Sequence, residues 1–252
     1  MSQRCPTRLT RRTFLASVAI AALAESTGPV LSRTFGGILP WKSNSSDPPP
    51  ILDLNGWRFF TTTEARTVEA IVDRLVPADS LSIGGKEAGC AIFIDRQLAG
   101  SYGSSSRLYT KGPFPKGLPT QGYQGQATPA ELFRSGVEAL GVALKNQLGG
   151  KSFFELASGE QDQILKDLES GKLQLGDGVN GKAFFGMILN STMEGFFADP
   201  IYGGNKDMAS WRMLGFPGAR YDYRDHVSKH NEPYPLPPVS IVGAPEWQGR
   251  QG

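Results

Sequence analysis

The chain has 252 residues, 39% hydrophobic and 20% charged, a composition typical of a globular protein with one large domain or two small ones. Its formal net charge of +2 comes from the N-terminus, where four arginines precede the first acidic residue. Without those four, 22 basic residues stand against 24 acidic ones. A chain body this close to neutrality offers no electrostatic reason to expect nucleic-acid binding.

The first 24 residues have the pattern of a twin-arginine export signal. Arg11 and Arg12 are followed by Phe14 and Leu15, and a short apolar stretch leads to small residues suited to cleavage before Glu25. That stretch is well short of the roughly 20 apolar residues that span a bilayer. A chance arginine pair before a buried helix is the alternative. Since the twin-arginine pathway exports folded proteins, the signal predicts a periplasmic protein that the Tat translocase exports together with a cofactor-loaded partner.

Two regions are expected after the signal. Residues 25–58 are rich in Ser, Pro and Gly and predict a flexible N-terminal tether, and residues 59–252 predict one helical domain. Thr61 and Glu64 have the spacing of a capping box, so a helix is expected to begin here and to end before Pro77. The apolar face of this helix comprises Val68, Ile71, Val72 and Leu75.

A second helix is expected over residues 87–98, followed by an irregular loop over residues 101–127 that is rich in Gly, Ser, Pro and Tyr. The helix carries Cys90, the only thiol left once Cys5 is removed with the signal. A lone Cys is typical of a small buried hydrophobe, and an intermolecular disulfide is the alternative. A single cysteine excludes an iron–sulfur cluster or a covalent c-type haem in this chain.

A third helix is predicted by Thr128, Pro129 and Glu131, which combine a capping box with proline in the first turn. It is expected to end at Gly149-Gly150, because glycine readily adopts the left-handed conformation that terminates helices. Its buried residues are expected to be Leu132, Val137, Leu140, Leu144 and Leu148.

Two further helices complete the expected fold. Ser158 and Gln161 predict the start of the fourth, and Gly171 lies just past its end. Residues 182–196 predict a fifth that is apolar nearly all round, as is typical of a helix at the centre of a core. No strand alternation appears. We therefore expect a mainly-α fold, a single small helical domain with long ordered loops and an extended C-terminal tail rich in Pro and aromatic residues.

The stretch after the fifth helix loses all periodicity and concentrates Gly, Pro and large aromatics. A loop of this length is usually functional or disordered, and its aromatics favour order. Asp199 is expected to stabilise the turn before Pro200, and Asn205 to supply turn hydrogen bonds. Because Tyr, Trp and Arg are enriched at binding hot spots, we interpret the stretch as a partner-binding face; the alternative is that its rings only cover the helical core. The expected interface residues are Asp199, Tyr202, Asn205, Trp211, Phe216, Arg220, Tyr221 and Tyr223.

Motifs for catalytic or cofactor chemistry are missing. The chain has no dinucleotide-binding glycine motif, P-loop, nucleophile elbow or zinc-protease helix, so we expect no catalytic residue, no bound cofactor and no metal in this chain. His226 and His230 are the only histidines, and their spacing would place both on one face of a helix. Two histidines without a third ligand are a weak signal for a metal, and a solvated polar turn is the favoured interpretation.

The run DPIYGGNKDMASWRMLGFPGARYDYRDHVSKHNEPYPLPPV closely resembles the small (gamma) subunit of membrane-bound gluconate 2-dehydrogenase, the subunit 3 family. The resemblance extends from the N-terminal signal to about Val239 and is most specific over residues 195–223. It implies a subunit without a redox centre that partners an FAD-containing flavoprotein and a multi-haem cytochrome c. Those partners would oxidise D-gluconate at C2 and pass the electrons to quinone, and they would hold this chain at the periplasmic side of the cytoplasmic membrane.

Two hypotheses follow. In the first, the chain is an accessory subunit that assembles with the flavoprotein, accompanies its export and stabilises the complex. In the second, it is a free-standing periplasmic enzyme or ligand-binding protein that uses Asp199, Asn205 or the two histidines in a pocket. Similar small subunits are found in dehydrogenases for 2-ketogluconate, sorbitol, fructose and glucose, so the sequence leaves the substrate open.

Overall fold

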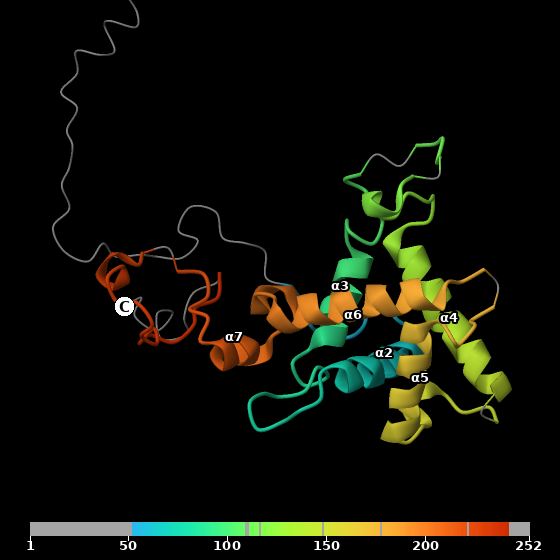
Figure 1. Cartoon of the computed structure of the whole chain (residues 1–252), viewed down its shortest axis with the longest axis horizontal. Helices are drawn as coiled ribbons and strands as arrows, with labels where there is room; N and C mark the ends of the chain where they lie inside the picture. Colours follow the sequence, from blue (N-terminus) through green and yellow to red (C-terminus); the bar gives the residue numbers. More distant parts are fainter. Residues whose placement is uncertain are drawn as a thin grey trace, which may run out of the picture. The chain divides into compact units, whose positions relative to one another are not determined.

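Regular structure in the described part of the chain consists of six α-helices and five short 3-10 turns. The structure is a computed structural model that describes residues 52–108, 111–115, 117–147, 149–176, 178–220 and 222–241. The expected export signal, with Arg11, Arg12, Phe14 and Leu15, and residues 25–51 of the expected tether lie outside the described residues. The α-helices are α2 (Thr62–Leu75), α3 (Cys90–Ala99), α4 (Pro129–Gln147), α5 (Ser158–Ser170), α6 (Gly181–Phe197) and α7 (Ala209–Leu214), shown in Figure 1.

The expected fold class is confirmed. No β-strand forms within the described ranges, where the only strand-like contact is an isolated parallel bridge between Gly218 and Val239. None of the helices described is both long and apolar enough to cross a membrane. The described residues therefore form a mainly-α domain in which helices carry the core and irregular segments join them.

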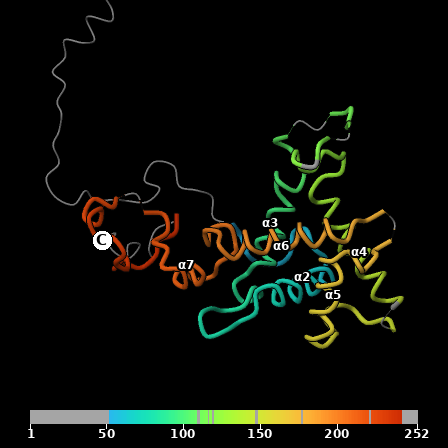
Figure 2. Tube along the Cα trace, in the orientation of Figure 1, coloured from blue at the N-terminus to red at the C-terminus, as the bar shows by residue number. Residues whose placement is uncertain are grey.

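Helix α6 lies at the centre of this domain, as its sequence predicts. It packs against α2, α3, α4 and α5 along its length and against α7 beyond its C-terminal end (Figure 2). Phe184, Ile188 and Phe196 on α6 are almost completely buried. Burying one such side chain contributes about 1.5–3 kcal/mol, so α6 supplies a large share of the hydrophobic stabilisation of the fold.

Local capping signals place two helix starts correctly. The Thr61 hydroxyl accepts the Glu64 N–H at 3.3 Å, and the Glu64 carboxylate accepts the Thr61 N–H at 2.7 Å, so α2 begins with a complete capping box. Thr128 and Glu131 make the same pair of bonds, at 3.3 and 2.7 Å, before α4. These bonds satisfy backbone donors that a helix start otherwise leaves unpaired.

Two other helix starts differ from the prediction. Helix α3 begins at Cys90 rather than at residue 87, because Gly89 adopts a left-handed conformation with φ 82° that no helix continues through. Ser158 is the first residue of α5 and not its cap. The Glu160 carboxylate accepts the N–H of Ala157 at 3.0 Å, and Gln161 is buried with its amide donating to the Phe153 carbonyl at 2.9 Å.

Glycines allow α3 and the residues after α6 to approach α6 closely. A β-carbon on Gly195 would lie 2.9 Å from the ring of Phe93 in α3, and one on Gly204 would lie 2.0 Å from the Gly195 carbonyl oxygen. A larger residue at 195 would displace the Phe93 ring, and one at 204 would require backbone movement. The chain that follows α6 is therefore folded back onto the end of this helix, and this positions the segment that carries the expected interface.

Candidate interaction surface

The residues after α6 contain more helical structure than expected. We call residues 199–241 the C-terminal segment. The expectation that periodicity is absent here is wrong in part, since short helical turns succeed one another, broken by left-handed backbone at Asn205, Asp207 and Met208. Its elements are η3 (Pro200–Tyr202), η4 (Lys206–Met208), α7 (Ala209–Leu214) and η5 (Arg224–His226).

Asp199 ties the two ends of the C-terminal segment together. Its carboxylate caps η3 by accepting the Ile201 N–H at 3.0 Å. It also accepts the Ser240 hydroxyl and the Ile241 N–H, each at 2.7 Å. Asp199 is buried, and a buried carboxylate is stable only when such donors replace water. The expected turn-stabilising role is confirmed, and it extends 42 residues along the chain.

Asn205 has a similar internal role and is completely buried. Its side-chain amide donates to the Ala198 carbonyl at 2.9 Å, and its amide oxygen accepts both the N–H and the hydroxyl of Ser210, at 3.0 and 2.8 Å. The backbone N–H of Lys206 donates to the Ala88 carbonyl at 3.1 Å. These bonds join the end of α6, the start of α7 and the loop before α3, which confirms Asn205 as a source of turn hydrogen bonds.

Trp211 and Phe216 form an edge-to-face aromatic pair at the end of α7. The indole of Trp211 is 7% exposed and donates to the Phe197 carbonyl at 2.9 Å. The Phe216 ring meets it edge to face at 5.1 Å and remains 47% exposed. Gly218 packs against the indole of Trp211, since a β-carbon there would lie 2.9 Å from the indole and 2.2 Å from the Val239 carbonyl oxygen. Trp211 thus covers the core, and Phe216 presents an outward ring above it.

A second aromatic group gathers around Tyr234. Its ring lies 5.6 Å from that of Tyr223 and 4.8 Å from that of His226. The Arg220 guanidinium lies 5.6 Å from the centre of the Tyr234 ring and donates to the Pro237 carbonyl at 2.7 Å. Burial raises the pKa of the Tyr223 phenol and the nearby Tyr234 raises it further, while Arg220 lowers it. Arg220 and Tyr223 are therefore engaged within the segment, and each is partly exposed.

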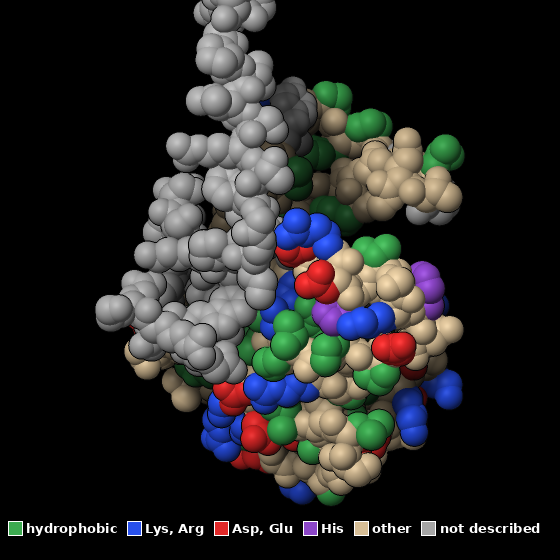
Figure 3. Space-filling view, turned by 90° about the vertical axis from the view of Figure 1, so that its left-hand side faces the viewer, with side chains coloured by type: hydrophobic (Ala, Val, Ile, Leu, Met, Phe, Trp, Pro, Cys, Tyr) green, Lys and Arg blue, Asp and Glu red, His purple; other side chains and the backbone are tan. Residues whose placement is uncertain are grey.

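The outward side of the C-terminal segment is apolar with charges of both signs. Exposed hydrophobic side chains on it are Tyr202, Met213, Leu214, Phe216, Val227 and Leu236. The segment also carries five Lys or Arg and five Asp or Glu. Figure 3 looks onto this part of the molecule and shows hydrophobic, basic and acidic side chains interspersed. Aromatic and apolar area surrounded by mixed polar groups is typical of protein–protein interfaces.

The expected interface residues thus divide into two kinds. Asp199, Asn205 and Trp211 are buried and bond within the chain, whereas Tyr202 and Phe216 expose about half of their surface. Arg220 and Tyr223 are intermediate, and Tyr221 lies outside the described residues. Contact of this set with a partner stays a prediction. The structure reduces the set of residues that can touch a partner to the outward ones. The buried ones shape the surface that carries them.

The two histidines lie in a polar turn. Only Arg224–His226 is helical, so His226 and His230 do not share a helix face as their spacing suggested. His226 contacts Tyr234 and is partly buried, while His230 is exposed. In the described ranges, no group of three or more His, Cys, Asp or Glu side chains lies in an arrangement that could hold a metal ion.

Sequence reasoning missed a buried ion pair in α3. Asp95 and Arg96 are neighbours, both buried, and their side chains are directly paired. The Asp95 carboxylate also accepts three consecutive backbone N–H groups, those of Arg58, Phe59 and Phe60, at 2.9, 3.0 and 2.9 Å. The sequence does contain a signal for this pair, an acidic and a basic residue side by side within the apolar stripe of the helix. Charged residues at buried positions need internal partners, so the two could have been expected to pair.

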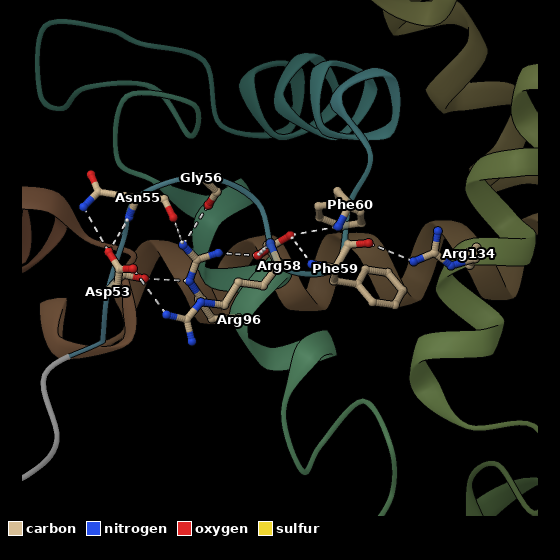
Figure 4. A network of polar contacts seen from close by, with 9 residues as sticks. Asp53, Asn55, Gly56, Arg58, Phe59, Phe60, Arg96 and Arg134 are labelled. Carbon is tan, nitrogen blue, oxygen red and sulfur yellow. Dashed lines mark hydrogen bonds and ion pairs between the residues drawn. The ribbon is translucent and has the colours of Figure 1, made fainter.

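This pair fastens the segment before α2 onto α3. Arg96 donates to the carbonyl oxygens of Asp53 and Gly56 at 3.0 and 2.8 Å, and Arg134 from α4 donates to that of Phe59 at 2.8 Å (Figure 4). The expected tether extended to residue 58, yet from Asp53 onward the backbone is bonded to the helical domain. The domain therefore includes at least six residues that composition assigned to the tether.

By its fold the protein is a small, mainly-α domain with an irregular C-terminal segment that buried Asp and Asn side chains hold in place. Residues 62–218, more than half of the chain, match the family described as Gluconate 2-dehydrogenase subunit 3. The chain therefore belongs to the gluconate 2-dehydrogenase subunit 3 family, which confirms the resemblance seen in its sequence. Neither a curated protein nor a solved structure matches the chain. The family is one of subunits, so membership implies partner subunits.

Proposed function

We propose that this chain is the non-catalytic small subunit of a membrane-bound, periplasm-facing gluconate 2-dehydrogenase complex. The observation that carries the proposal is the family match, which begins at the first residue of α2 and ends at Gly218 within the C-terminal segment. FAD would be held by a flavoprotein subunit that converts D-gluconate to 2-dehydro-D-gluconate. Haem c would be held by a cytochrome c subunit that passes the electrons to quinone.

The C-terminal segment is the surface that binds the flavoprotein in this proposal. Its outward side combines apolar side chains with charges of both signs, which suits a protein partner better than a lipid or a nucleic acid. The carboxylate of Asp199 and the amide of Asn205 bond to the chain itself. Those bonds support a role in shaping a binding surface and disfavour a pocket in which the same atoms bind a sugar acid.

A binding experiment tests this surface by comparing a double variant at two outward residues with a control variant elsewhere. Tyr202→Ala combined with Leu214→Ala removes apolar area from the C-terminal segment, and both side chains are exposed. We expect the flavoprotein subunit to bind the double variant at least tenfold more weakly, because hot-spot side chains dominate interface affinity. Leu81→Ala, at a residue 73% exposed before α3, is the matched control and should leave binding unchanged. Equal binding of the flavoprotein by the unchanged chain, the double variant and the control would rule out this surface.

The export role requires a separate experiment. Arg11→Lys combined with Arg12→Lys disables the twin-arginine pattern in a strain that produces all three subunits. We expect the flavoprotein to stay in the cytoplasm and dye-linked gluconate oxidation to be lost from the membranes. A flavoprotein that reaches the periplasm regardless would show that it does not depend on this chain. If the isolated chain itself bound or oxidised gluconate, the free-standing alternative would replace the subunit proposal.

A further inference from the structure

The 101–127 loop between α3 and α4 is the second place where apolar side chains face outward. Fifteen large hydrophobic side chains are exposed in the described part of the chain, and five of them lie in this loop. They are Tyr102, Leu108, Phe114, Leu118 and Tyr123, between 40% and 69% exposed. In the upper part of Figure 3, at the height that this loop has in Figure 1, hydrophobic side chains project from the surface. Exposed apolar side chains gathered in this way are typical of a surface that contacts another protein or a membrane.

The base of the loop is fixed, so these side chains leave the domain at a defined point. The Ala130 N–H donates to the Gly103 carbonyl at 3.1 Å, and the Gly103 N–H donates to the Gln97 carbonyl at 3.1 Å. Gly103 also packs directly on the backbone of Leu98, since a β-carbon there would lie 1.8 Å from the Leu98 carbonyl oxygen. The loop is thereby closed between the end of α3 and the start of α4, which limits the entropy that binding would cost.

The charges carried by the loop itself all have one sign. An acid from outside acts on the loop at its base, where burial and the nearby Glu194 of α6 raise the pKa of Tyr102. No Asp or Glu occurs between Asp95 and Glu131, while Arg107, Lys111 and Lys116 fall within that interval. A protein surface that complements a partner usually mixes both signs, as the C-terminal segment does. Lys and Arg combined with aromatic and leucine side chains instead suit the interface of an anionic bilayer, where phosphates attract the cations and rings lie at headgroup depth.

We propose that the 101–127 loop is a membrane-contact segment that places its apolar side chains in the headgroup region of an anionic phospholipid bilayer. Arg107 and Lys111 bind lipid phosphates beside them. This goes beyond the proposed function, in which partner subunits alone attach the chain to the membrane. The two are independent, because the loop can bind lipid whether or not the C-terminal segment binds a flavoprotein.

A fluorescent probe at Leu118 tests the proposal directly. Full-length chain with Cys5→Ser and Leu118→Cys is labelled with NBD, and Cys90 stays unlabelled because it is buried and burial raises the pKa of its thiol to about 12. The matched control carries Leu236→Cys in the C-terminal segment, where the side chain is also exposed. Vesicles contain phosphatidylglycerol and phosphatidylcholine, or phosphatidylcholine alone. Because the probe is local, vesicle binding by the N-terminal signal does not mimic a loop response.

The expected result is a several-fold rise and blue shift of NBD emission at residue 118 with anionic vesicles, with little change at residue 236. Arg107→Gln and Lys111→Gln should each weaken the vesicle response about fivefold, and the response should fall with added salt. Lys206→Gln and Arg212→Gln, exposed in the C-terminal segment, are the charge controls and should leave it unchanged.

Two results would overturn the proposal. One is an unchanged emission at residue 118 with anionic vesicles. The other is a response at residue 118 to the purified flavoprotein and cytochrome subunits in the absence of lipid, with none to vesicles, which would assign the loop to a protein interface. In either case the binding experiment on Tyr202 and Leu214 would still decide the proposed function by itself.

Discussion

The 101–127 loop and the C-terminal segment have similar compositions, but they are held to the helical domain in different ways. Both are rich in Gly, Pro and aromatic residues, and both expose large hydrophobic side chains. The loop is closed at its base by Gly103 and Ala130. The C-terminal segment is fastened along its length, by Asp199 to residues 240–241, by Asn205 to Ser210, and by Trp211 to Phe197.

Exposed apolar side chains therefore have to be interpreted together with the charge of their segment and with the bonds that hold it. Where buried polar side chains hold a segment in one shape and both charge signs are present, a defined protein surface is favoured, because such an interface needs shape complementarity. Where only the base is held and the charged residues of the loop itself are all basic, contact with a deformable anionic surface is favoured. The following four predictions test this contrast.

The largest effect is expected at Asn205. Asn205→Ala removes the partners of Ala198 and Ser210 and places alanine at φ 46°, so the free energy of unfolding should fall by about 2–4 kcal/mol. Urea unfolding followed by circular dichroism measures this. Asn231→Ala is the control, at φ 60° but exposed, and should lose only about 1 kcal/mol. Equal losses would mean that the buried hydrogen bonds contribute nothing.

A smaller loss is expected at Asp199. Asp199→Asn replaces one carboxylate oxygen with an amide NH2, so the bond from either the Ile201 N–H or the Ile241 N–H is lost, which should cost about 1–2 kcal/mol. The same variant should be cleaved faster by proteases between α7 and residue 241. Asp207→Asn serves as the control, since Asp207 is exposed and Asn tolerates its left-handed backbone. If the two variants were cleaved at equal rates, Asp199 would not fasten the segment.

Substitutions in the loop should leave stability almost unchanged. Leu108→Ser and Leu118→Ser affect side chains that are more than 65% exposed, so the free energy of unfolding should stay within about 0.5 kcal/mol of the original. The same urea titration measures it. Leu140→Ser in α4, where the side chain is fully buried, is the contrasting variant and should lose at least about 3 kcal/mol. A large loss at Leu108 or Leu118 would show that the loop packs on the domain.

The smallest effect concerns a local ion pair. The Arg224 guanidinium donates to both oxygens of Asp222, which lowers the pKa of that carboxyl to about 2. A lowered pKa favours the folded state above the ordinary carboxyl range, and this contribution is lost as the pH falls toward 2. Carbon-13 NMR titration of the Asp222 carboxyl should show a midpoint near 2, shifted upward by Arg224→Gln. Arg224→Lys should give a partial shift, since lysine cannot make the forked contact.

Features that depend on neighbouring residues could be predicted from the sequence. The capping boxes at Thr61 and Thr128 each join residues three positions apart, and Gly171 ends α5 in the left-handed conformation its type favours. The position of α6 followed from its nearly uniform hydrophobicity. Cys90 is buried, as expected of a lone small hydrophobe.

Features that depend on distant residues were missed or only partly foreseen. Asp95 accepts N–H groups that lie at least 35 residues earlier, and nothing near Asp95 in the chain identifies them. The stretch before α2 therefore resembled a tether although it is bonded to α3. Helix α7 was missed because its six residues are too few to display a period.

The five longer helices, the mainly-α class and the family could all be predicted from the sequence, since local hydrogen bonds and hydrophobic periodicity depend on short stretches of chain. Which residues of the candidate surface face outward became clear only from the folded structure. Asp199, Asn205 and Trp211 have the same types that bind partners, yet they are buried, and Tyr202 and Phe216 are exposed. That division depends on which backbone groups come within hydrogen-bonding distance after folding, and residue type alone does not encode it.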